Sequence, residues 1–518
     1  MLRRRTAPAD AAVRKPRTTA VPMFFAALAG AASVLSFEPL GWWPVQFITL
    51  AFLFYQVGMD TSVKRSALIG WAFGFGWNIA GIHWLYVSMT RYGGLHGGLT
   101  VIALCLLAAY MGIYAGLATG VSTWLRARWA VPVKGFLLLM LPFAWGLSEW
   151  MRGWVMTGFP WASSGYAHNF SPLGGYAPLV GVYGVGVLAA LCASALVMLT
   201  QRTRILGAGM FAAILAIGFG LGTIEWTRPE GKPISVRLLQ GNIEQQFKWN
   251  PEHFGRTLDL YQAMVTEAPA DLIALPETAL VRPPQALPPG YVESYQAFAA
   301  KTGSNLMFGI PFVDGPSQYS NSVAGITSAG QPYRFDKQHL VPFGEFVPSG
   351  FRWFVNMMNI PMGDMTRGAE VQAPFAVRDQ LVLPNVCYED VFGEEIALQL
   401  RSMPRPATML LNVSNLAWFG ESVAIAQHLQ ISQMRSIETG RPMLRATNTG
   451  ATALIDGRGK VVQALPWHQR GTLAVNVQGM AGMTPFIRFG NYTMLALAAL
   501  AFGAAWWMGR KYLKSRQK

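Results

Sequence analysis

The sequence predicts a multi-span α-helical membrane domain joined to an α/β domain, and three observations lead to that prediction. Apolar runs of about 20 residues, the length that a bilayer-spanning helix needs, fill much of residues 1–226 and recur near the C-terminus. Between them, residues 228–480 contain short β-rich runs that alternate with helical patterns and turns. The charged residues divide along the same boundaries. Together these patterns favour a membrane protein that carries a folded polar domain.

The net charge of +15 at pH 7 comes from the apolar part of the chain. From Thr227 to Ile487 there are 20 Lys or Arg and 21 Asp or Glu, whereas the remaining residues hold 21 basic and 5 acidic side chains. A nucleic-acid-binding domain would gather basic and aromatic residues on one folded face. Here the basic residues flank apolar runs, so the charge indicates membrane topology and no nucleic-acid partner.

Eight apolar runs are candidate membrane spans. They lie near residues 20–37, 40–58, 66–89, 97–124, 131–150, 175–200, 204–223 and 490–509. We therefore expect an N-terminal membrane domain with about seven spans (1–226), a polar domain (227–487), and a last span with a basic tail (488–518). One or two helices would suffice as an anchor, so eight favour a role that involves lipid or a channel.

The basic residues also assign the two sides of the membrane. In an alternating eight-span arrangement, 18 of the 21 basic residues outside the polar domain fall on one side, and only Arg91, Arg152 and Arg488 fall on the other. The positive-inside rule makes the first side cytoplasmic. We therefore expect both termini in the cytoplasm and the polar domain on the exported side. The first apolar run is longer than the core of a signal peptide, and we expect it to be retained.

Two stretches between the predicted spans place aromatic and polar side chains near the outer interface. They read GIHWLYVSM (81–89) and GFPWASSGY (158–166). Aromatic belts also form at membrane interfaces for structural reasons alone. Both a functional and a structural interpretation of these stretches therefore stay open.

The polar domain is expected to be a layered α/β sandwich. Likely strands of this sandwich are 234–243, 270–277, 304–313, 321–328, 380–389, 407–415 and 443–456, and helical patterns lie near 251–267, 289–302 and 421–438. The sequence shows no glycine-rich phosphate loop and no Cys and His residues at metal-ligand spacing. We therefore predict neither a metal nor a cofactor.

Cys387 is the first candidate functional residue. It is the only cysteine of the polar domain and ends the β-rich run LVLPNVCYED (381–390), whereas Cys105 and Cys192 lie in apolar stretches. A lone thiol at the end of a strand is a candidate nucleophile. An inert buried cysteine is the alternative.

Glu277 and Lys337 are the other two candidates. Glu277 ends the apolar run DLIALPE, where an unpaired buried charge would be costly, although a structural carboxylate fits as well. Lys337 lies in the apolar stretch YRFDKQHLVPFGEFVP (333–348), where a solvated surface lysine is the simpler interpretation. A thiol, a base and a cation are the three groups that acyl transfer requires. Together they favour a cysteine acyl-transfer enzyme.

Three motifs in this order resemble the nitrilase superfamily. They are LPET with Glu277, FDKQHLVPFGE with Lys337 and NVCYED with Cys387. Joined to eight predicted spans, they resemble its membrane-integrated branch, the apolipoprotein N-acyltransferases. The segments QGNIEQQFKWN (240–250), NVSNLAWFG (412–420) and RATNTG (445–450) are also similar to that family. The resemblance covers nearly the whole chain.

The resemblance implies an αββα sandwich with a Glu-Lys-Cys triad. Glu277 would be the general base for the Cys387 thiol, and Lys337 would stabilise the oxyanion. Glu345, Tyr388 and Glu389 would support the site, and Trp249 would take part in substrate handling. One departure is Leu416, where the family pattern leads us to expect an acidic or polar residue. This departure puts the roles of Asn412 and Trp418 in doubt.

The resemblance also implies the reaction. Such enzymes move an acyl chain from a phospholipid, typically phosphatidylethanolamine, through a cysteine thioester to the α-amine of a diacylglyceryl-cysteine apolipoprotein. They need no cofactor and lie in the bacterial inner membrane with the catalytic domain on the periplasmic side. We expect this chain to do the same, as a monomer in contact with membrane lipid.

Two other functions are compatible with parts of the sequence. A membrane-tethered, nitrilase-like amidase would share the triad and release the acyl group to water. A transporter or an interaction protein is the other alternative. Charges within the spans would favour transport, but the spans carry very few, and Glu38 and Glu149 lie near span ends, which counts against this alternative. The methionine-rich stretch FRWFVNMMNIPMGDM (351–365) is either a mobile lid that touches lipid or acceptor, or ordinary core.

Overall fold

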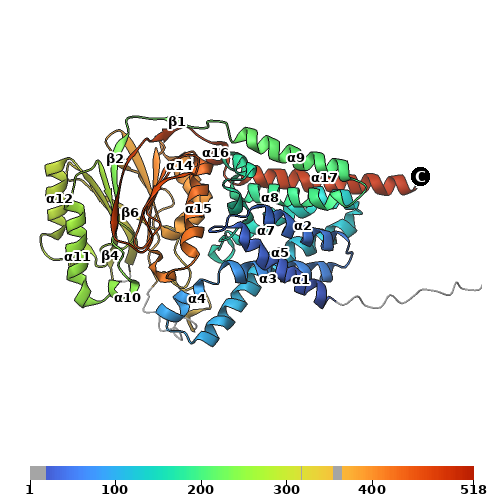
Figure 1. Ribbon diagram of the computed structural model, residues 1–518, viewed down its shortest axis with the longest axis horizontal. Coiled ribbons are helices and arrows are strands. Elements are labelled where there is room, and N and C mark those ends of the chain that lie inside the picture. Colours follow the sequence, from blue (N-terminus) through green and yellow to red (C-terminus); the bar gives the residue numbers. More distant parts are fainter. Residues whose placement is uncertain (1–18, 317, 354–363, 518) are drawn as a thin grey trace, which may run out of the picture.

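The computed structural model describes residues 19–316, 318–353 and 364–517, which form a helical half and an α/β half placed end to end (Figure 1). The helical half consists of the helices up to α9 together with α17. The α/β half contains the strands and α10 to α16. Most of the predicted lid lies outside the described residues, at 354–363.

The helical half is built from apolar helices that pack side by side. Their bounds are α1 (Ala20–Ala32), α2 (Pro44–Gly58), α3 (Val63–Gly81), α4 (Leu85–Val87), α5 (Gly97–Trp129), α6 (Val133–Gly135), α7 (Leu141–Arg152), α8 (Ala177–Leu199), α9 (Arg204–Leu221) and α17 (Tyr492–Gln517). Glycines allow α3 to approach its neighbours closely. A Cβ on Gly76 would lie 1.9 Å from the Ala27 carbonyl oxygen of α1, and one on Gly70 would lie 2.1 Å from Thr119 Oγ1 of α5.

Helices occupy all eight predicted span ranges, but they differ in length and composition. Among the described residues, four helices are long and apolar enough to cross a membrane: Gly97–Trp129, Pro172–Leu199, Arg204–Leu221 and Tyr492–Arg516. Ala20–Ser36 and Pro44–Gly58 are shorter apolar helices. The other two predicted spans coincide with α3 and with the helical run that ends in α7. The eight-span arrangement itself stays a prediction.

The α/β half contains two six-stranded sheets. The first has the order β13-β2-β3-β4-β5-β6 and the second β12-β11-β10-β9-β8-β7. The strands of the first are β2 (Ile234–Gln240), β3 (Leu272–Ala274), β4 (Asn305–Gly315), β5 (Gln318–Ile326), β6 (Pro332–Asp336) and β13 (Gly471–Val477). Those of the second are β7 (Phe375–Val377), β8 (Gln380–Val386), β9 (Met409–Ser414), β10 (Met443–Thr447), β11 (Ala453–Ile455) and β12 (Val461–Ala464). A short ribbon pairs β1 (Arg228–Pro229) with β14 (Met480–Ala481).

The two sheets face each other across an apolar core, with helices on both outer sides. Val236 of β2, Val323 of β5, Val382 of β8 and Leu411 of β9 belong to one buried cluster between the sheets. The first sheet is covered by α11 (Pro251–Thr266) and α12 (Tyr291–Thr302), and the second by α14 (Gly393–Ser402) and α15 (Ala424–Thr439) (Figure 1). The structure also describes the short α-helices α10 (Gln245–Lys248) and α16 (Pro485–Phe489) in this half. The predicted α/β sandwich with αββα layers is confirmed.

The sequence located most strands but misjudged one segment. The range 443–456 was expected as one strand, and this was wrong, because β10 and β11 are antiparallel strands joined by a turn around Gly450. Gly450 adopts φ +128°, a conformation that side chains with a Cβ rarely reach. The polar run NTGAT within an otherwise strand-like segment holds that turn. The edge strands β6, β7, β12 and β13 were not predicted.

Helix α15 is the element that joins the two halves. Nearly all of its residues are buried, because one side covers the second sheet and the other packs on the helical half. Ile431 and Met434 of α15 belong to the apolar cluster of the helical half. The helix ends at Thr439 and is capped by Gly440, whose φ of +64° and close approach to Thr227 disfavour a side chain.

A buried ion pair fixes this junction. Arg435 NH2 lies 3.1 Å from Glu438 Oε1, and both side chains are inaccessible to solvent. Glu438 Oε1 also accepts a hydrogen bond from the Val182 N–H of α8 at 2.8 Å. The Arg435 guanidinium lies 5.6 Å from the centre of the Tyr166 ring. The charged side chains of Arg435 and Glu438 therefore connect α15 to the helical half, through the Tyr166 ring and the Val182 N–H.

Replacement of one partner of this pair should be more harmful than replacement of both. Arg435→Met leaves the buried Glu438 carboxyl without its ion-pair partner, and we expect a loss of about 3–5 kcal/mol in stability. The double variant Arg435→Met/Glu438→Leu removes both charges and should recover most of that loss. Thermal unfolding in detergent micelles measures both effects. A double variant as unstable as Arg435→Met alone would contradict this account.

Candidate active site

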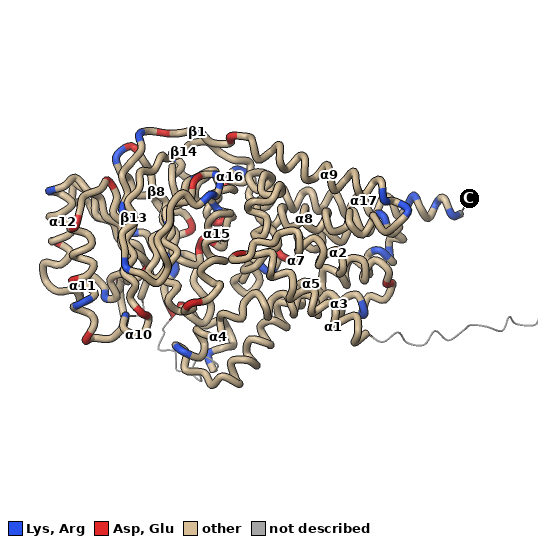
Figure 2. Tube along the Cα trace, in the orientation of Figure 1, with Lys and Arg blue, Asp and Glu red and all other residues tan. Residues whose placement is uncertain are grey.

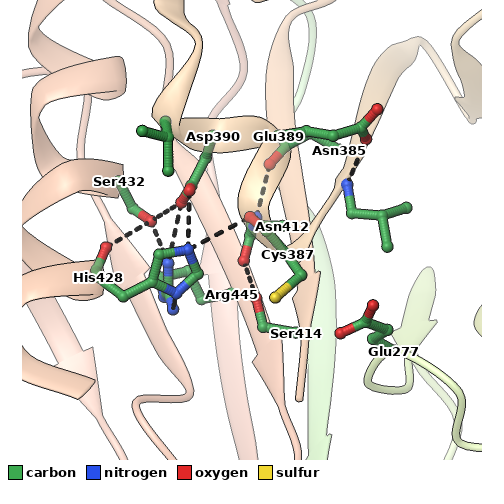
Figure 3. Close-up of polar contacts among 12 residues, drawn as sticks. Glu277, Asn385, Cys387, Glu389, Asp390, Asn412, Ser414, His428, Ser432 and Arg445 are labelled. Carbon is green, nitrogen blue, oxygen red and sulfur yellow. Dashed lines mark hydrogen bonds and ion pairs between the residues drawn. The ribbon is translucent and has the colours of Figure 1, made fainter. Parts of the chain in front are cut away.

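The three predicted catalytic residues follow the ends of three strands and meet between the sheets. Glu277 follows β3, Lys337 follows β6, and Cys387 follows β8 and begins the short 3-10 helix η8 (Cys387–Val391). Lys337 Nζ lies 3.8 Å from Glu277 Oε1. Figure 3 shows Cys387 between Glu277 on one side and a polar group around His428 on the other. The structure therefore brings together residues that are 110 positions apart in the sequence.

Hydrogen bonds fix both oxygens of the Glu277 carboxylate. Oε1 accepts from Asn321 Nδ2 at 2.8 Å, and Oε2 accepts from the backbone N–H of Asn415 at 2.9 Å. Asn321 comes from β5 of the first sheet, and Asn415 follows β9 of the second. Glu277 is thus held from both sheets in one orientation, which a general base requires.

Lys337 is buried and compensated by two carboxylates. Its side chain is 1% exposed, and its Nζ donates to Glu345 Oε1 at 2.8 Å. Burial lowers the pKa of Lys337, but Glu345, Glu277 and Cys387 together raise it above the usual range. Lys337 is therefore charged at neutral pH. Glu345 is itself fixed by the Val341 N–H, at 2.8 Å from Oε2, and by Asn321 Nδ2.

Cys387 occupies a backbone conformation that few non-glycine residues adopt. Its φ is +52°, at the point where β8 turns into η8. Such strain persists only where the surroundings impose it, and it is concentrated at functional sites. Burial raises the pKa of the Cys387 thiol, and the Glu277 carboxylate raises it further, whereas Lys337 opposes the shift. The resting residue is therefore a thiol that needs a base.

Glu389 ties the cysteine segment to the lysine segment. Its Oε2 accepts from the Val386 N–H at 2.6 Å, and its Oε1 accepts from the N–H groups of Gln338 at 2.7 Å and His339 at 3.1 Å. Val386 precedes Cys387, and Gln338 follows Lys337. One carboxylate therefore sets the separation of nucleophile and cation. Burial raises the pKa of Glu389 to about 7, although these N–H donors favour the charged form.

Tyr388 and Trp249 have different surroundings. The Tyr388 hydroxyl donates to the Gly158 carbonyl oxygen of the helical half at 3.0 Å. Trp249 follows α10 and is 51% exposed. Tyr388 therefore connects the site to the helical half, and Trp249 presents an aromatic surface to whatever approaches the α/β half there.

The unexpected Leu416 is part of the wall around the nucleophile. Its side chain is buried in a small apolar cluster with Ile425 and Ala451, and Cys387 packs against that cluster. Asn412 Nδ2 donates to Asn385 Oδ1 at 2.7 Å and to the Cys387 carbonyl oxygen at 3.0 Å. Trp418 packs edge-on against Tyr92, with ring centres 5.6 Å apart. Asn412 therefore holds the Cys387 backbone in this structure, where Leu416 replaces the expected polar residue.

Lys248 is a second lysine of the site, and the sequence analysis did not single it out. Its side chain is 3% exposed, and its Nζ donates to the Glu277 carbonyl oxygen at 3.0 Å. Burial lowers the pKa of Lys248 to about 8, although Glu277 and Cys387 nearby oppose the shift. The only sequence signal was its place in QGNIEQQFKWN, a segment noted for its family pattern. Unlike Lys337, this amine changes its charge near neutral pH.

The arrangement supplies the groups for acyl transfer. It holds a thiol, an oriented carboxylate and a buried ammonium, and the ammonium can stabilise negative charge on a carbonyl oxygen. Within residues 19–316, 318–353 and 364–517, no three His, Cys, Asp or Glu side chains come together in a group that could hold a metal ion.

Comparison with known proteins gives two family matches and several close relatives. The N-terminal domain of apolipoprotein N-acyltransferase matches residues 29–195, and carbon-nitrogen hydrolase matches residues 235–486. The apolipoprotein N-acyltransferase of Ralstonia nicotianae is 48% identical, covering 93% of this chain and 92% of its own. Those of Bordetella bronchiseptica and Nitrosomonas europaea are each 41% identical, covering 94% and 93% of this chain and 96% and 97% of their own.

Glu389→Gln should increase the distance between Cys387 and Lys337. In either orientation of the amide, an NH2 group faces a backbone N–H that Glu389 now binds. Loss of one or two charge-assisted hydrogen bonds corresponds to about 2–4 kcal/mol, so we expect transfer activity to fall roughly 100-fold with a lower unfolding temperature. The exposed Glu293 on α12 gives the control Glu293→Gln. Full activity of Glu389→Gln would exclude this role.

Lys248→Met should change the pH dependence of Cys387 reactivity. Below about pH 8 Lys248 is charged and stabilises the Cys387 thiolate. This stabilisation is lost as the amine loses its proton above pH 8. At pH 7 we expect the variant to react with iodoacetamide roughly tenfold more slowly than the parent, which is about 1.4 kcal/mol, and the two rates to converge above pH 9. Exposed Lys301 gives the control Lys301→Met. A rate difference independent of pH would show that the charge is not responsible.

Proposed function

Because the chain belongs to the apolipoprotein N-acyltransferase family and is an acyltransferase for lipoproteins, we propose that Cys387 carries the acyl group as a thioester between two half-reactions. The donor is a membrane phospholipid, with phosphatidylethanolamine as the expected species. The acceptor is the α-amine of a diacylglyceryl-cysteine lipoprotein. The observation that carries this proposal is the meeting of Glu277, Lys337 and the strained Cys387 between the two sheets.

In the first half-reaction, the Cys387 thiol attacks the ester carbonyl of the phospholipid. Glu277 takes the thiol proton as the bond from sulfur to carbon forms, and Lys337 stabilises the negative charge that develops on the carbonyl oxygen. The bond from carbon to the glycerol oxygen then breaks. The protonated Glu277 returns the proton to that oxygen, which yields a lysophospholipid and the acyl-enzyme.

In the second half-reaction, the acceptor amine attacks the thioester carbonyl as a free base. Glu277 takes a proton from the attacking nitrogen, and Lys337 again stabilises the oxyanion. The bond from carbon to sulfur breaks, an amide forms, and Glu277 reprotonates the Cys387 sulfur. The enzyme returns to its resting state, so one triad serves both steps without a cofactor.

The position of the site agrees with substrates that lie in a membrane. The Tyr388 hydroxyl reaches Gly158, and His339 Nε2 donates to the Thr157 carbonyl oxygen at 2.9 Å, so the site borders the helical half. Most Lys and Arg of the helical half lie at its far end from the sheets (Figure 2). By the positive-inside rule, we place that end and both termini in the cytoplasm. The α/β half of a monomer then faces the periplasm of the bacterial inner membrane.

A thioester on Cys387 is the first expected product when the enzyme meets phospholipid alone. We expect intact-mass spectrometry to show one added acyl chain on the parent protein and on a Cys105→Ala/Cys192→Ala variant. Cys387→Ala should show no adduct and no transfer, because the remaining groups cannot form a covalent intermediate. An adduct that persists in Cys387→Ala would place the acyl group on another residue.

A second incubation separates transfer from hydrolysis. Acyl-enzyme mixed with a diacylated lipopeptide should give a peptide with one further acyl chain in amide linkage. Release of free fatty acid, with the peptide unchanged, would instead identify a membrane-tethered amidase. The same mass measurement reads both products, and Cys387→Ala serves as the blank.

A further inference from the structure

A buried polar network lies beside Cys387, on the side opposite Glu277 (Figure 3). Its members are Asp390 of η8, His428 and Ser432 of α15, and Arg445 of β10, and each is at most 1% exposed. None of them belongs to the Glu-Lys-Cys triad. Buried polar groups are costly unless they are satisfied, so a network of this size needs a reason.

The hydrogen bonds determine which His428 nitrogen carries the proton. Arg445 NH2 lies 3.0 Å from His428 Nδ1. A guanidinium can only donate, so Nδ1 accepts and the proton resides on Nε2. His428 Nε2 faces two acceptors, Asp390 Oδ1 at 2.8 Å and the Cys387 carbonyl oxygen at 3.2 Å. The imidazole therefore presents a donor to the backbone of the nucleophile.

Asp390 and Arg445 hold the imidazole in that orientation. Arg445 NH1 lies 3.2 Å from Asp390 Oδ2, and the Ser432 hydroxyl donates to the same oxygen. In the second sheet, Arg445 of β10 pairs with Asn412 of β9, which pairs with Asn385 of β8. This row of three paired residues ends at Asn385, two positions before Cys387. The strand register therefore places Arg445 near Cys387.

Two donors therefore fix the Cys387 carbonyl from two different elements. Asn412 Nδ2 reaches it from β9 at 3.0 Å, and His428 Nε2 reaches it from α15 at 3.2 Å. The carbonyl belongs to the peptide that follows a residue at φ +52°. Without both donors that peptide can rotate toward a relaxed conformation, and the sulfur moves with it.

The helical half contacts the same imidazole. The Trp161 ring stacks on His428, with ring centres 5.7 Å apart and planes 14° apart. Trp161 Nε1 also donates to Gln427 Oε1 at 2.8 Å, and Arg152 NH1 holds the Trp161 carbonyl oxygen at 2.8 Å. Trp161 lies in the stretch 158–166, for which the sequence left a functional and a structural interpretation open. The stack fixes the plane of the imidazole.

We propose that His428 is a positioning residue that donates from Nε2 to the Cys387 carbonyl and thereby keeps the nucleophile in its attacking conformation. Through the Trp161 stack, this contact makes the nucleophile geometry depend on the helical half. The inference rests on the proposed role of Cys387 as the nucleophile. It adds a residue from α15 that touches neither the acyl group nor the reacting sulfur.

Two substitutions distinguish the acceptor role of His428 Nδ1 from the donor role of His428 Nε2. In His428→Asn the amide oxygen can replace Nδ1 as acceptor for Arg445, but the side chain is too short to reach the Cys387 carbonyl. In His428→Gln the longer amide can replace Nε2 as donor. Both variants lose the ring that stacks on Trp161, so they form a matched pair. Gln433→Leu, which removes a buried hydrogen bond from Gln433 Nε2 to Gly459 on the same helix, controls for damage to α15.

The rate of acyl-enzyme formation, its KM for phospholipid, and the alkylation of Cys387 by iodoacetamide are measured in the Cys105→Ala/Cys192→Ala background. We expect His428→Asn to lose about 100-fold in rate and about tenfold in alkylation, with KM within threefold of the parent and an unfolding temperature close to that of His428→Gln. His428→Gln should stay within tenfold of the parent in rate. Gln433→Leu should keep the parental rate.

Equal rates in His428→Asn and His428→Gln would overturn the proposal, whether both are low or both are high. If His428→Asn does not fold, His428→Gln decides alone: it must retain a rate within tenfold of the parent, and a folded but inactive His428→Gln contradicts the donor role. Alkylation needs no phospholipid. A parent protein that forms no thioester would therefore contradict the proposed function, while the alkylation pair would still test His428.

Discussion

The burial of the Lys337 ammonium between two carboxylates constrains the rest of the site. A buried cation is costly unless it is paired and hydrogen-bonded. Glu345 supplies the short contact, at 2.8 Å, while Glu277 lies 3.8 Å away and takes its hydrogen bonds from Asn321 and the Asn415 N–H. Compensation of the Lys337 charge therefore rests mainly on Glu345, which leaves Glu277 available as the proposed general base. Glu277 keeps an orientation fixed by both sheets without being locked into a tight ion pair.

The fixed position of Lys337 also explains why Cys387 must be held in place by residues outside the triad. Lys337 and Cys387 follow strands of different sheets, so their separation depends on how the sheets close. Glu389 bridges the two segments, and Tyr388 and His339 join them to the helical half. Helix α15 lies between the halves and carries Arg435 and Glu438 into the junction. The helical half therefore does more than anchor the α/β half, because it forms part of the frame around Cys387.

The sequence identified the parts of the site that contrast with their surroundings. Glu277, Lys337 and Cys387 each interrupt an apolar or strand-like run, so their types alone suggested a thiol, a base and a cation. Lys248, Asn415 and His428 lie in mixed polar segments and show no such contrast. Their roles depend on non-local closure of the sheets and on the position of α15. The same limit applies to the turn around Gly450, where a short polar run divided an expected strand into β10 and β11.

The raised pKa of the Cys387 thiol bears on why such a site transfers an acyl group to an amine. In the proposed mechanism, the resting thiol becomes a nucleophile only as Glu277 accepts its proton, so attack requires that the ester already be bound beside it. In the proposed acyl-enzyme, sulfur leaves only as Glu277 returns a proton to it, so Glu277 must first take a proton from the attacking group. Water is a weak nucleophile, whereas an amine oriented beside Glu277 would attack the thioester carbonyl and supply that proton. In that mechanism, the need for a proton from the attacking group would keep the thioester intact until the acceptor amine arrives.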